Sequence, residues 1–133
     1  MNRGLIKLFR CIGLSNVAAH VLSTLLLENK PLSLDELSDK SGYAKSHISS
    51  ALTLLENMVL IEKIHGKRRK LLVKVNENII RRLLKEHLVK LKKILHRIHR
   101  EVNNQYISRE ASGLAEELSK LIDRLDVRGR RVI

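Results

Sequence analysis

Cysteine is scarce in this chain of 133 residues, with Cys11 as its single representative. One thiol cannot build a disulfide framework within the chain or a cysteine-based zinc finger, and such scarcity is typical of proteins from a reducing compartment. The basic neighbours Lys7 and Arg10 would favour the thiolate form of Cys11. We therefore expect a small buried hydrophobic residue at this position, with a redox sensor as the alternative.

Proline, aromatic residues and long apolar runs are also rare. The single proline and the six glycines exclude a collagen-like chain or a proline-rich linker. Phe9, Tyr43 and Tyr106 are too few aromatics for the stacking platforms that bind single-stranded nucleic acids. No apolar run could span a bilayer, and none of signal-peptide length follows the first bases. We therefore expect a cytoplasmic protein that does not enter a membrane.

Signatures of catalysis and of metal binding are missing as well. The sequence has no glycine-rich phosphate loop, no nucleophile elbow and no carboxylate pair at the end of an expected strand. His96 and His99 could share a metal with another histidine, but the neighbouring Arg97 and Arg100 would repel a cation. We predict no enzyme activity, no metal and no cofactor.

Positive charge is what the chain has in excess. It contains 26 Lys and Arg against 14 Asp and Glu, a formal net charge of +12. Residues 60–75 hold six bases and one acid, and residues 81–100 hold eight bases and one acid. Residues 101–127 reverse the sign with six acids and three bases, before three arginines close the chain. This distribution predicts a polyanionic partner.

The spacing of apolar residues predicts a mostly α chain with a helix-turn-helix. Helices are expected over residues 15–28, 33–41 and 44–57. Ser33 stands three residues before a glutamate, the spacing of a capping box, and Gly42 can take the left-handed conformation that ends a helix. Two helices joined by a short glycine-containing turn are typical of a helix-turn-helix, whose second helix would be the recognition helix over 44–57.

The apolar period then changes towards two. Residues 60–64 and 71–75 are short runs rich in β-branched side chains, separated by a polar tip at 65–70 with four consecutive bases. This pattern predicts a β-hairpin, and a hairpin directly after a helix-turn-helix is a wing. The basic tip has no purpose in folding, so we expect it to place arginine in a minor groove and lysine on phosphates.

Two places therefore offer contacts to duplex DNA. The outward face of the recognition helix carries short donors and acceptors for base edges in the major groove, although an ordinary polar helix face would look similar. The wing tip adds cations. The predicted DNA-binding residues are Lys45, Ser46, His47, Ser49, Ser50, Thr53, Lys67, Arg68, Arg69 and Lys70.

The second half of the chain predicts two amphipathic helices. Asn76 would cap a long helix from Glu77 to about Tyr106, and a last helix would run from about Glu110 to Leu125. Their apolar residues exceed what a small head can cover, so we predict a homodimer, with the last helix packing on its own subunit or on its partner. The predicted dimerisation residues are Leu84, Leu88, Leu91, Leu95, Ile98, Val102, Leu114, Leu118 and Leu121.

The chain thus divides, on sequence, into a DNA-binding domain over residues 1–76 and a helical dimerisation region with a basic tail over residues 77–133. The bases of residues 81–100 are either a solvated helix surface or contacts to flanking phosphates.

Residues 13–76 resemble the winged helix-turn-helix of MarR-type regulators, with the GbsR-like branch as the nearest in character. The resemblance rests on the segments 31–37 and 45–52 and on Gly66-Lys67-Arg68 in the hairpin. It implies a homodimeric transcription factor that binds pseudo-palindromic duplex DNA. It also implies DNA contacts from Ser46, Ser49 and Ser50 on the recognition helix and from Arg68 in the wing.

Two positions depart from that family pattern. The family commonly has glycine after the recognition helix, and here the matching residue is Val59, which resists a left-handed conformation, so we expect a differently built helix exit. An acidic residue usually precedes the wing arginine, and here Lys67 replaces it, which favours a grip on phosphates over base readout. Three aromatic residues cannot form a cage for a choline-like cation, so the effector stays unknown.

These observations favour a dimeric, sequence-selective regulator of transcription that is associated with the nucleoid. Two alternatives remain open at this point. One is an architectural, chromatin-like protein that coats duplex DNA with little selectivity. The other is a winged-helix adaptor that binds an acidic protein partner.

Overall fold

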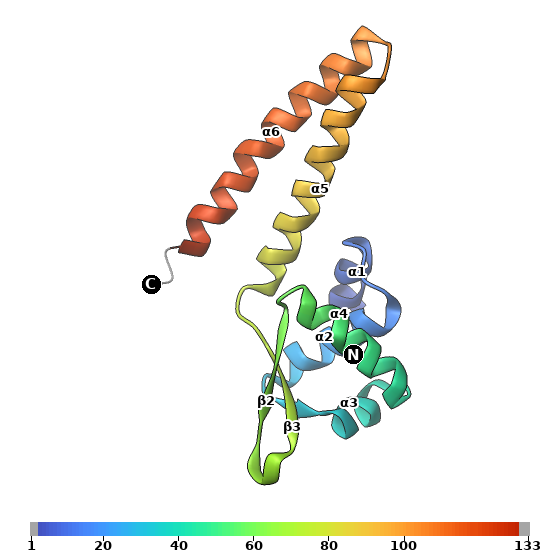
Figure 1. Cartoon of the computed structure of the whole chain (residues 1–133), viewed down its shortest axis with the longest axis vertical. Coiled ribbons are helices and arrows are strands. Elements are labelled where there is room, and N and C mark those ends of the chain that lie inside the picture. Colours follow the sequence, from blue (N-terminus) through green and yellow to red (C-terminus); the bar gives the residue numbers. More distant parts are fainter. Residues whose placement is uncertain (1–2, 131–133) are drawn as a thin grey trace. The chain divides into compact units, whose positions relative to one another are not determined.

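The computed structural model describes residues 3–130, and the side chains of all of these except Arg69 and residues 127–130. Contacts divide the chain into two compact units, Met1–Ile79 and Ile80–Ile133. The expected mostly α fold with a small sheet is confirmed (Figure 1). The expected basic tail includes side chains and residues that lie outside this description.

Four helices belong to the first unit. They are α1 (Arg3–Cys11), α2 (Asn16–Glu28), α3 (Leu34–Ser41) and α4 (Lys45–Asn57). The sequence interpretation assigned no helix to the segment of α1, which packs on α2 by burying Phe9. Cys11 at the end of α1 is exposed, so the expected burial of this thiol is wrong. The amphipathic pattern of α1 turns Phe9 inwards and leaves Cys11 on the solvent side.

The helix boundaries follow from capping groups. The Ser15 hydroxyl accepts a 3.2 Å hydrogen bond from the N–H of Ala18, and Asn29 ends α2 in a left-handed conformation with φ of 53°. At α3, the backbone N–H of Ser33 donates to Glu36 Oε1 at 3.1 Å, and the N–H of Glu36 donates back to Ser33 Oγ at 3.2 Å. The predicted capping box is therefore confirmed, and so are the bounds of α2, α3 and α4 to within a residue.

A three-stranded antiparallel sheet completes the first unit, in the order β1-β3-β2. Its strands are β1 (Leu32–Ser33), β2 (Ile61–His65) and β3 (Leu71–Val75). The predicted hairpin is confirmed, with its first strand displaced by one residue. In this hairpin Ile61 pairs with Val75, and Lys63 pairs with Val73. The two-residue strand β1 was not predicted, because so short a segment leaves no alternation to detect.

The core of the first unit lies between its helices and this sheet. Leu22 and Leu25 of α2, Ile48 and Leu55 of α4 and Val73 of β3 are all buried. Each such side chain contributes roughly 1.5–3 kcal/mol relative to an exposed one. The shared core holds the helix-turn-helix and the hairpin together as one body.

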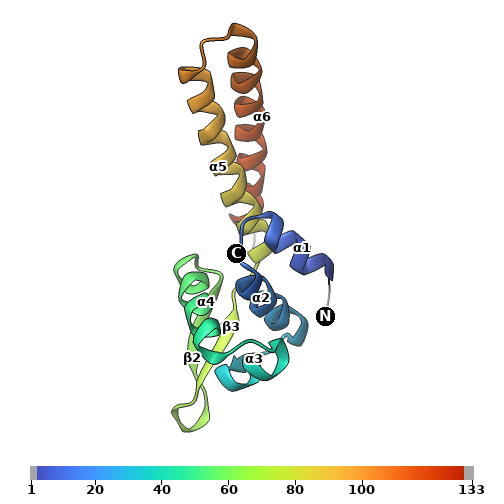
Figure 2. The ribbon, with the colours of Figure 1, turned by 90° about the vertical axis from the view of Figure 1, so that its right-hand side faces the viewer.

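The second unit is a pair of antiparallel helices, α5 (Ile79–Glu101) and α6 (Gln105–Arg130), which lie side by side in both views (Figures 1 and 2). The predicted bounds are wrong here, since α5 ends about five residues early and α6 begins five residues early. The reason is Asn104, whose Oδ1 accepts hydrogen bonds from the N–H groups of Tyr106 at 3.0 Å and Ile107 at 3.2 Å. This N-cap starts α6 where periodicity alone continued the preceding helix.

The predicted start of α5 is also wrong. Asn76 does not cap a helix, because its side-chain amide donates to the carbonyl oxygen of Val59 at 2.9 Å. The chain instead passes through Asn78 at a positive φ of 57° and becomes helical at Ile79. No helix within residues 3–130 is long and apolar enough to cross a membrane.

Candidate nucleic-acid interface

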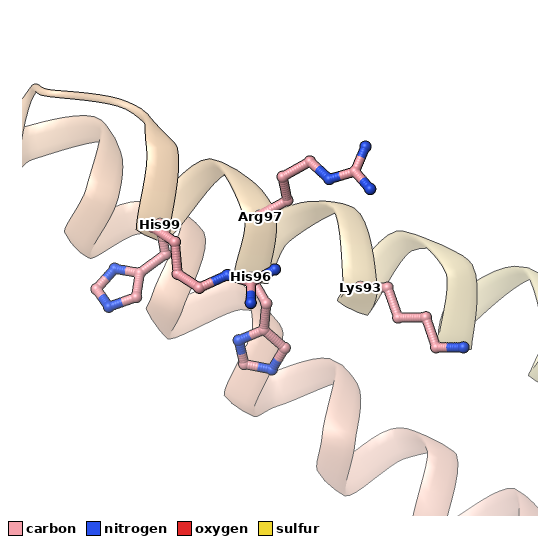
Figure 3. Close-up of a pocket in the computed structure, with 5 residues that line it drawn as sticks. Lys93, His96, Arg97 and His99 are labelled. Atoms are coloured by element: carbon pink, nitrogen blue, oxygen red, sulfur yellow. The ribbon is translucent and has the colours of Figure 1, made fainter.

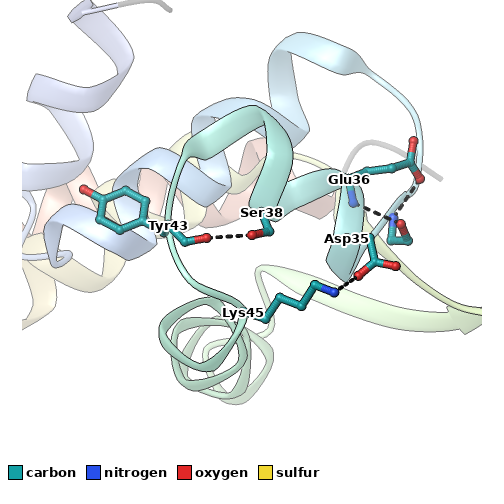
Figure 4. Close-up of polar contacts among 6 residues, drawn as sticks. Asp35, Glu36, Ser38, Tyr43 and Lys45 are labelled. Carbon is teal, nitrogen blue, oxygen red and sulfur yellow. Dashed lines mark hydrogen bonds and ion pairs between the residues drawn. The ribbon is translucent and has the colours of Figure 1, made fainter.

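The turn between α3 and α4 positions the recognition helix. Gly42 ends α3 with φ of 80°, a conformation that glycine adopts without a steric penalty, and its N–H donates to the carbonyl of Ser38 at 2.9 Å. The Ser38 hydroxyl in turn donates to the carbonyl of Tyr43 at 2.8 Å (Figure 4). These bonds fix the angle at which α4 leaves the turn.

The helix α4 divides into a buried and an exposed face. Ile48, Leu52 and Leu55 point into the core, as their spacing predicted. The opposite face bears every predicted DNA-binding residue of this helix in an exposed position: Lys45, Ser46, His47, Ser49, Ser50 and Thr53. The structure thus brings these six side chains together on one surface.

Two hydroxyls on this face already donate a hydrogen bond to their own helix. Ser50 Oγ donates to the carbonyl of Ser46 at 3.3 Å, and Thr53 Oγ1 donates to the carbonyl of Ser49 at 3.1 Å. In these rotamers the oxygen lone pairs face outwards as acceptors. Adenine N6 and cytosine N4 are the groups in the major groove that donate to such acceptors.

Lys45 at the start of α4 forms an ion pair with Asp35 of α3 (Figure 4). The hydrogen bond and the charge of Lys45 hold the pKa of the Asp35 carboxyl below its ordinary value, and Asp35 raises the pKa of Lys45 in return. Lys70 also lowers the pKa of Asp35 by its positive charge. Lys45, which was predicted to contact DNA, therefore has an ion-pair partner in Asp35 of the preceding helix. The sequence did not indicate this partner.

The wing is tied to the helix-turn-helix by backbone pairing. Strand β1, which leads directly into α3, pairs with β3 through Leu32 and Val73 and through Ser33 and Leu72. At the wing tip, which we define as residues 65–70, Arg68 takes a left-handed conformation with φ of 60°. Because β3 is held by both neighbours, the tip keeps a fixed relation to the start of α3.

The two lysines on the hairpin strands form ion pairs, whereas the basic side chains described at the wing tip form none. Lys63 lies 3.4 Å from Glu56 of α4, and Lys74 lies 3.6 Å from Glu62 across the hairpin. No ion pair within the described residues involves the exposed lysines and arginine described at the tip, Lys67, Arg68 and Lys70. The side chain of Arg69, also a predicted contact, lies outside the description.

The exit from α4 corrects one expectation. Val59 adopts a left-handed conformation with φ of 61°, although a β-branched residue resists it, so the expectation of a differently built exit is wrong. The hydrogen bond from Asn76 to the Val59 carbonyl helps to hold the residue in this conformation. No local pattern signals this bond, since the two residues are 17 positions apart.

The helix pair α5–α6 has one polar flank. Lys85 contacts Asp126, Lys92 Nζ lies 3.2 Å from Ser119 Oγ, and Ser108 Oγ donates to the carbonyl of His99 at 3.0 Å. The three α5 residues are seven positions apart, so they lie on one side of the helix. The same unit shows that α6 packs on α5 of its own chain.

The predicted dimerisation residues fall into two groups. Leu88 of α5 is buried and Leu95, Ile98 and Leu118 are half-buried, where α5 and α6 pack on each other. Leu84, Leu91, Leu114 and Leu121 are instead 38–44% exposed. Val102 is exposed in the turn after α5.

The exposed apolar side chains of the two helices lie on the flank opposite the polar contacts. Around the circumference of α5, in the direction in which the helix winds, these side chains come before those that face α6. On α6 they likewise come before the side chains that face α5. Because the two helices are antiparallel, both sets lie on the same side of the helix pair. We call this surface the apolar face. Its residues are Ile80, Leu84, Leu91, Ile94, Ile107, Leu114 and Leu121.

The histidines considered as metal ligands do not converge. His99 Nδ1 lies 3.0 Å from the carbonyl of Ser108, while His96 lines an open surface depression with the neighbouring bases Lys93 and Arg97 (Figure 3). Among the described residues no group of three His, Cys, Asp or Glu side chains could hold a metal ion.

Solved structures of transcriptional regulators share this architecture. One crystal structure of a transcriptional regulator is 18% identical with a TM-score of 0.69, covering 96% of this chain and 92% of that one. A MarR-family regulator from Silicibacter pomeroyi is 20% identical with a TM-score of 0.51, covering 87% and 78%. MepR, a transcription regulator of the Staphylococcus aureus multidrug efflux pump MepA, is 15% identical with a TM-score of 0.51, covering 90% and 88%.

At these identities the likeness establishes the fold, and it confirms the MarR-type winged helix-turn-helix. The GbsR-like branch remains a prediction from the sequence. A search of the curated proteins finds no match. The model of the family described as the sugar-specific transcriptional regulator TrmB matches residues 8–94, more than half of the chain, so the chain belongs to the TrmB family of transcriptional regulators.

Proposed function

We propose that this TrmB-family regulator binds duplex DNA sequence-selectively, with α4 in the major groove and the wing tip on the adjacent minor groove and its phosphates. The observation that carries the proposal is the charge of the wing tip. Lys67, Arg68 and Lys70 have no ion-pair partner within the described residues, whereas Lys63 and Lys74 on the strands are paired. Unpaired cations at a fixed distance from a recognition helix fit a phosphate backbone.

The recognition helix supplies sequence preference in this proposal. Ser46, His47 and Ser49 lie in its first two turns, nearest the helix N-terminus. His47 can donate or accept through either ring nitrogen, and the hydroxyls act as acceptors or donors. Ser50 and Thr53 extend the same face, and Lys45 reaches a flanking phosphate by leaving Asp35.

A homodimer is part of the same proposal. The apolar face leaves seven large side chains between 38% and 53% exposed on one flank of α5 and α6. A second copy would cover them, and two heads on a two-fold axis would engage half-sites about 34–36 Å apart. Residues 1–76 then serve DNA binding and residues 77–133 serve dimerisation, with the protein located at the nucleoid.

Footprinting on random genomic fragments tests this function. We expect a protected site of approximate two-fold symmetry that survives an excess of nonspecific competitor DNA. Loss of all binding under competition would favour the architectural protein. Failure to shift any duplex at low salt would favour the adaptor that binds an acidic protein. We propose no enzyme activity, because the face formed by α4 and the wing tip presents neither an activated nucleophile nor a pair of acid and base groups.

Dimerisation has its own test. The double variant L91D/L121D places two carboxylates in the apolar face at positions that are 38% and 41% exposed in the single chain. We expect a monomer by sedimentation analysis, with helix content retained. A dimer of unchanged affinity would locate the interface elsewhere. The polar control is K120D, next to Leu121 but outside the apolar face, which should leave the dimer intact.

A further inference from the structure

An open depression on the surface of α5 is lined only by basic and imidazole side chains. It lies near the end of the helix, and its residues succeed one another at spacings of three and four, which place them along one side of α5 (Figure 3). No acidic residue among those described lines it. The lining residues, all exposed, are Lys93, His96, Arg97, His99 and Arg100.

Bases nearer the start of α5 have partners on α6, whereas those of the depression do not. Lys85 contacts Asp126, and Lys92 Nζ lies 3.2 Å from Ser119 Oγ. Four of the lining residues form no ion pair with any described residue, and we call them the cation cluster: Lys93, His96, His99 and Arg100. Positive charge that the chain leaves unpaired in one depression is available to an anion from outside.

The imidazole of His99 is held in a fixed orientation by α6. Its Nδ1 lies 3.0 Å from the carbonyl oxygen of Ser108 and 2.6 Å from Ser108 Oγ, and this hydroxyl donates its own hydrogen to the carbonyl of His99 at 3.0 Å. Both Ser108 oxygens therefore accept at Nδ1, so Nδ1 carries a hydrogen and Nε2 is the nitrogen left for a ligand. A ring that is ordered before any ligand arrives loses little further entropy on binding.

The stability of α5 does not account for the whole cation cluster. The negative end of the helix dipole favours cations in the last turn, where His99 and Arg100 lie. This effect falls off within one turn, so it does not explain Lys93 and His96. Lys93 and Arg97 are four positions apart, a spacing at which like charges destabilise a helix. A bound anion would offset this repulsion.

We propose that the cation cluster binds a small anion that carries a diphosphate group. Arg100 can donate to two oxygens of one phosphoryl group, and Lys93 adds a compact positive charge. His96 and Nε2 of His99 donate further hydrogen bonds when their rings are protonated. Lys93 and Arg100 are seven positions apart, roughly 10 Å along the helix axis, which leaves room for two linked phosphoryl groups. In the regulator proposed above this anion would be the small-molecule effector, and that role alone rests on the proposed function.

The backbone of a nucleic acid fits this surface less well than a small anion does. A strand carries a long row of phosphates, but exposed acids bound the cluster along α5, with Glu86 seven positions before Lys93 and Glu101 directly after Arg100. Arg97 does not extend the row, since its Nε lies 4.0 Å from Glu101 and its guanidinium extends away from the side of the two histidines (Figure 3). The positive surface is therefore short and bounded.

Calorimetric titration of the full chain with inorganic phosphate and with pyrophosphate, at fixed ionic strength, tests the site. We expect one saturable site per chain that binds pyrophosphate more tightly than phosphate. The variant K93A/R100A should weaken pyrophosphate binding at least about tenfold. The matched control K90A/K120A removes the same charge from exposed positions outside the depression and should bind as the wild type does. The proposal fails if the wild type shows no saturable binding of either anion, or if both double variants lose affinity equally.

Ser108→Ala tests whether the orientation of His99 matters for binding. The variant keeps every charge of the cation cluster and removes the hydroxyl that accepts at Nδ1 of His99. We expect pyrophosphate to bind about threefold more weakly, and Ser108→Thr, which retains the hydroxyl, to bind as the wild type does. Unchanged affinity in Ser108→Ala would remove His99 from the site. Circular dichroism of every variant confirms that α5 and α6 remain folded.

Electrophoretic shifts of duplex DNA separate this site from the proposed DNA interface. We expect K93A/R100A to bind duplex DNA as the control K90A/K120A does. If the wild type bound no pyrophosphate and K93A/R100A alone lost affinity for DNA, the cluster would be a contact to the DNA backbone and the proposal would be wrong. Binding of pyrophosphate by a chain that shifts no duplex would instead confirm the anion site and refute the proposed function.

Discussion

The side-chain amide of Asn76 donates a 2.9 Å hydrogen bond to the backbone carbonyl of Val59, the residue at which the chain turns out of α4. Val59 has a positive φ of 61° and is 56% exposed. This hydrogen bond therefore joins the end of the recognition helix to the end of the wing at a strained residue. Asn76 directly follows the last residue of β3, at the end of the hairpin that is farthest from the wing tip.

Replacing Val59 with glycine should stabilise the protein. A non-glycine residue in the left-handed region costs roughly 1–2 kcal/mol, and the greater freedom of glycine in the unfolded chain offsets part of the gain from removing this strain. We expect a net gain of about 0.5–1 kcal/mol in the free energy of unfolding, measured by denaturant titration. Val59→Ala is the control, because it removes the branched side chain and keeps the steric conflict of a Cβ. An equal gain in both variants would show that side-chain branching, and not the left-handed φ, is the source of strain.

The charges of the wing tip should govern the salt dependence of DNA binding. In the triple variant K67A/R68A/K70A we expect affinity to fall on all sequences, and the slope of log K against log salt to drop by about 0.9 for each phosphate that the wing no longer neutralises. Lys74→Ala is a matched control, since it removes a base of the same hairpin that is already paired with Glu62. Electrophoretic shifts across a salt series measure both. An unchanged slope in the triple variant would remove the wing from the interface.

Much of the first unit could be predicted from its sequence because local signals determine it. The capping residues Ser15 and Ser33 and the stop at Gly42 act within four positions of themselves, and the structure has helices with those bounds. The outward and inward faces of α4 follow from its apolar period. The burial of Ile48 and Leu55 and the exposure of Ser49 could therefore be predicted from spacing alone.

Features that depend on distant or competing residues could not be predicted. Asn76 looks like a helix cap in sequence, but the Val59 carbonyl, 17 positions earlier, takes its side chain. The apolar spacing of α5 continues past Glu101 to Val102 and Tyr106, so it does not indicate that α5 ends at Glu101. The ion pair between Asp35 and Lys45 joins two helices across the turn, and the charges alone do not reveal it.

Removing the carboxylate of Asp35 should release Lys45 to DNA. In Asp35→Asn the lysine loses its partner and the interface loses a negative charge. We expect affinity at low salt to rise by about threefold, the modest size typical of one exposed charge, measured by fluorescence anisotropy. The control Asp39→Asn removes the same charge from the same helix without breaking this ion pair. If both variants gained equally, the effect would come from net charge and not from Lys45.

Acid should weaken the capping box before it unfolds the protein. The backbone and hydroxyl hydrogen bonds of Ser33 hold the pKa of Glu36 below its ordinary value. A carboxyl with a lowered pKa stabilises the folded state above its ordinary pKa, and this contribution is lost as the pH falls through the lowered pKa. We expect Glu36→Gln to melt below the wild type at pH 7 and the difference in Tm to shrink as the solution is acidified through that range. The control Glu77→Gln removes an exposed carboxylate outside the capping box. A difference in Tm that stays constant with pH would show that the negative charge of Glu36 does not contribute to the stability of the capping box.

Sequence preference should reside in the first two turns of α4. His47 and Ser49 are exposed on the face opposite Ile48 and Leu52, and neither belongs to an ion pair among the described residues. Removal of a base-edge hydrogen bond costs about 1–3 kcal/mol on the cognate base pair and little elsewhere, so His47→Ala and Ser49→Ala should change the selected sequence at one position in each half-site. Selection of bound fragments from random duplexes, sequenced for each variant, measures this change. Lys63→Ala on strand β2 is the control, which should retain the wild-type preference. If both variants bound every sequence equally more weakly, α4 would contact only phosphates, and readout by the recognition helix would be refuted.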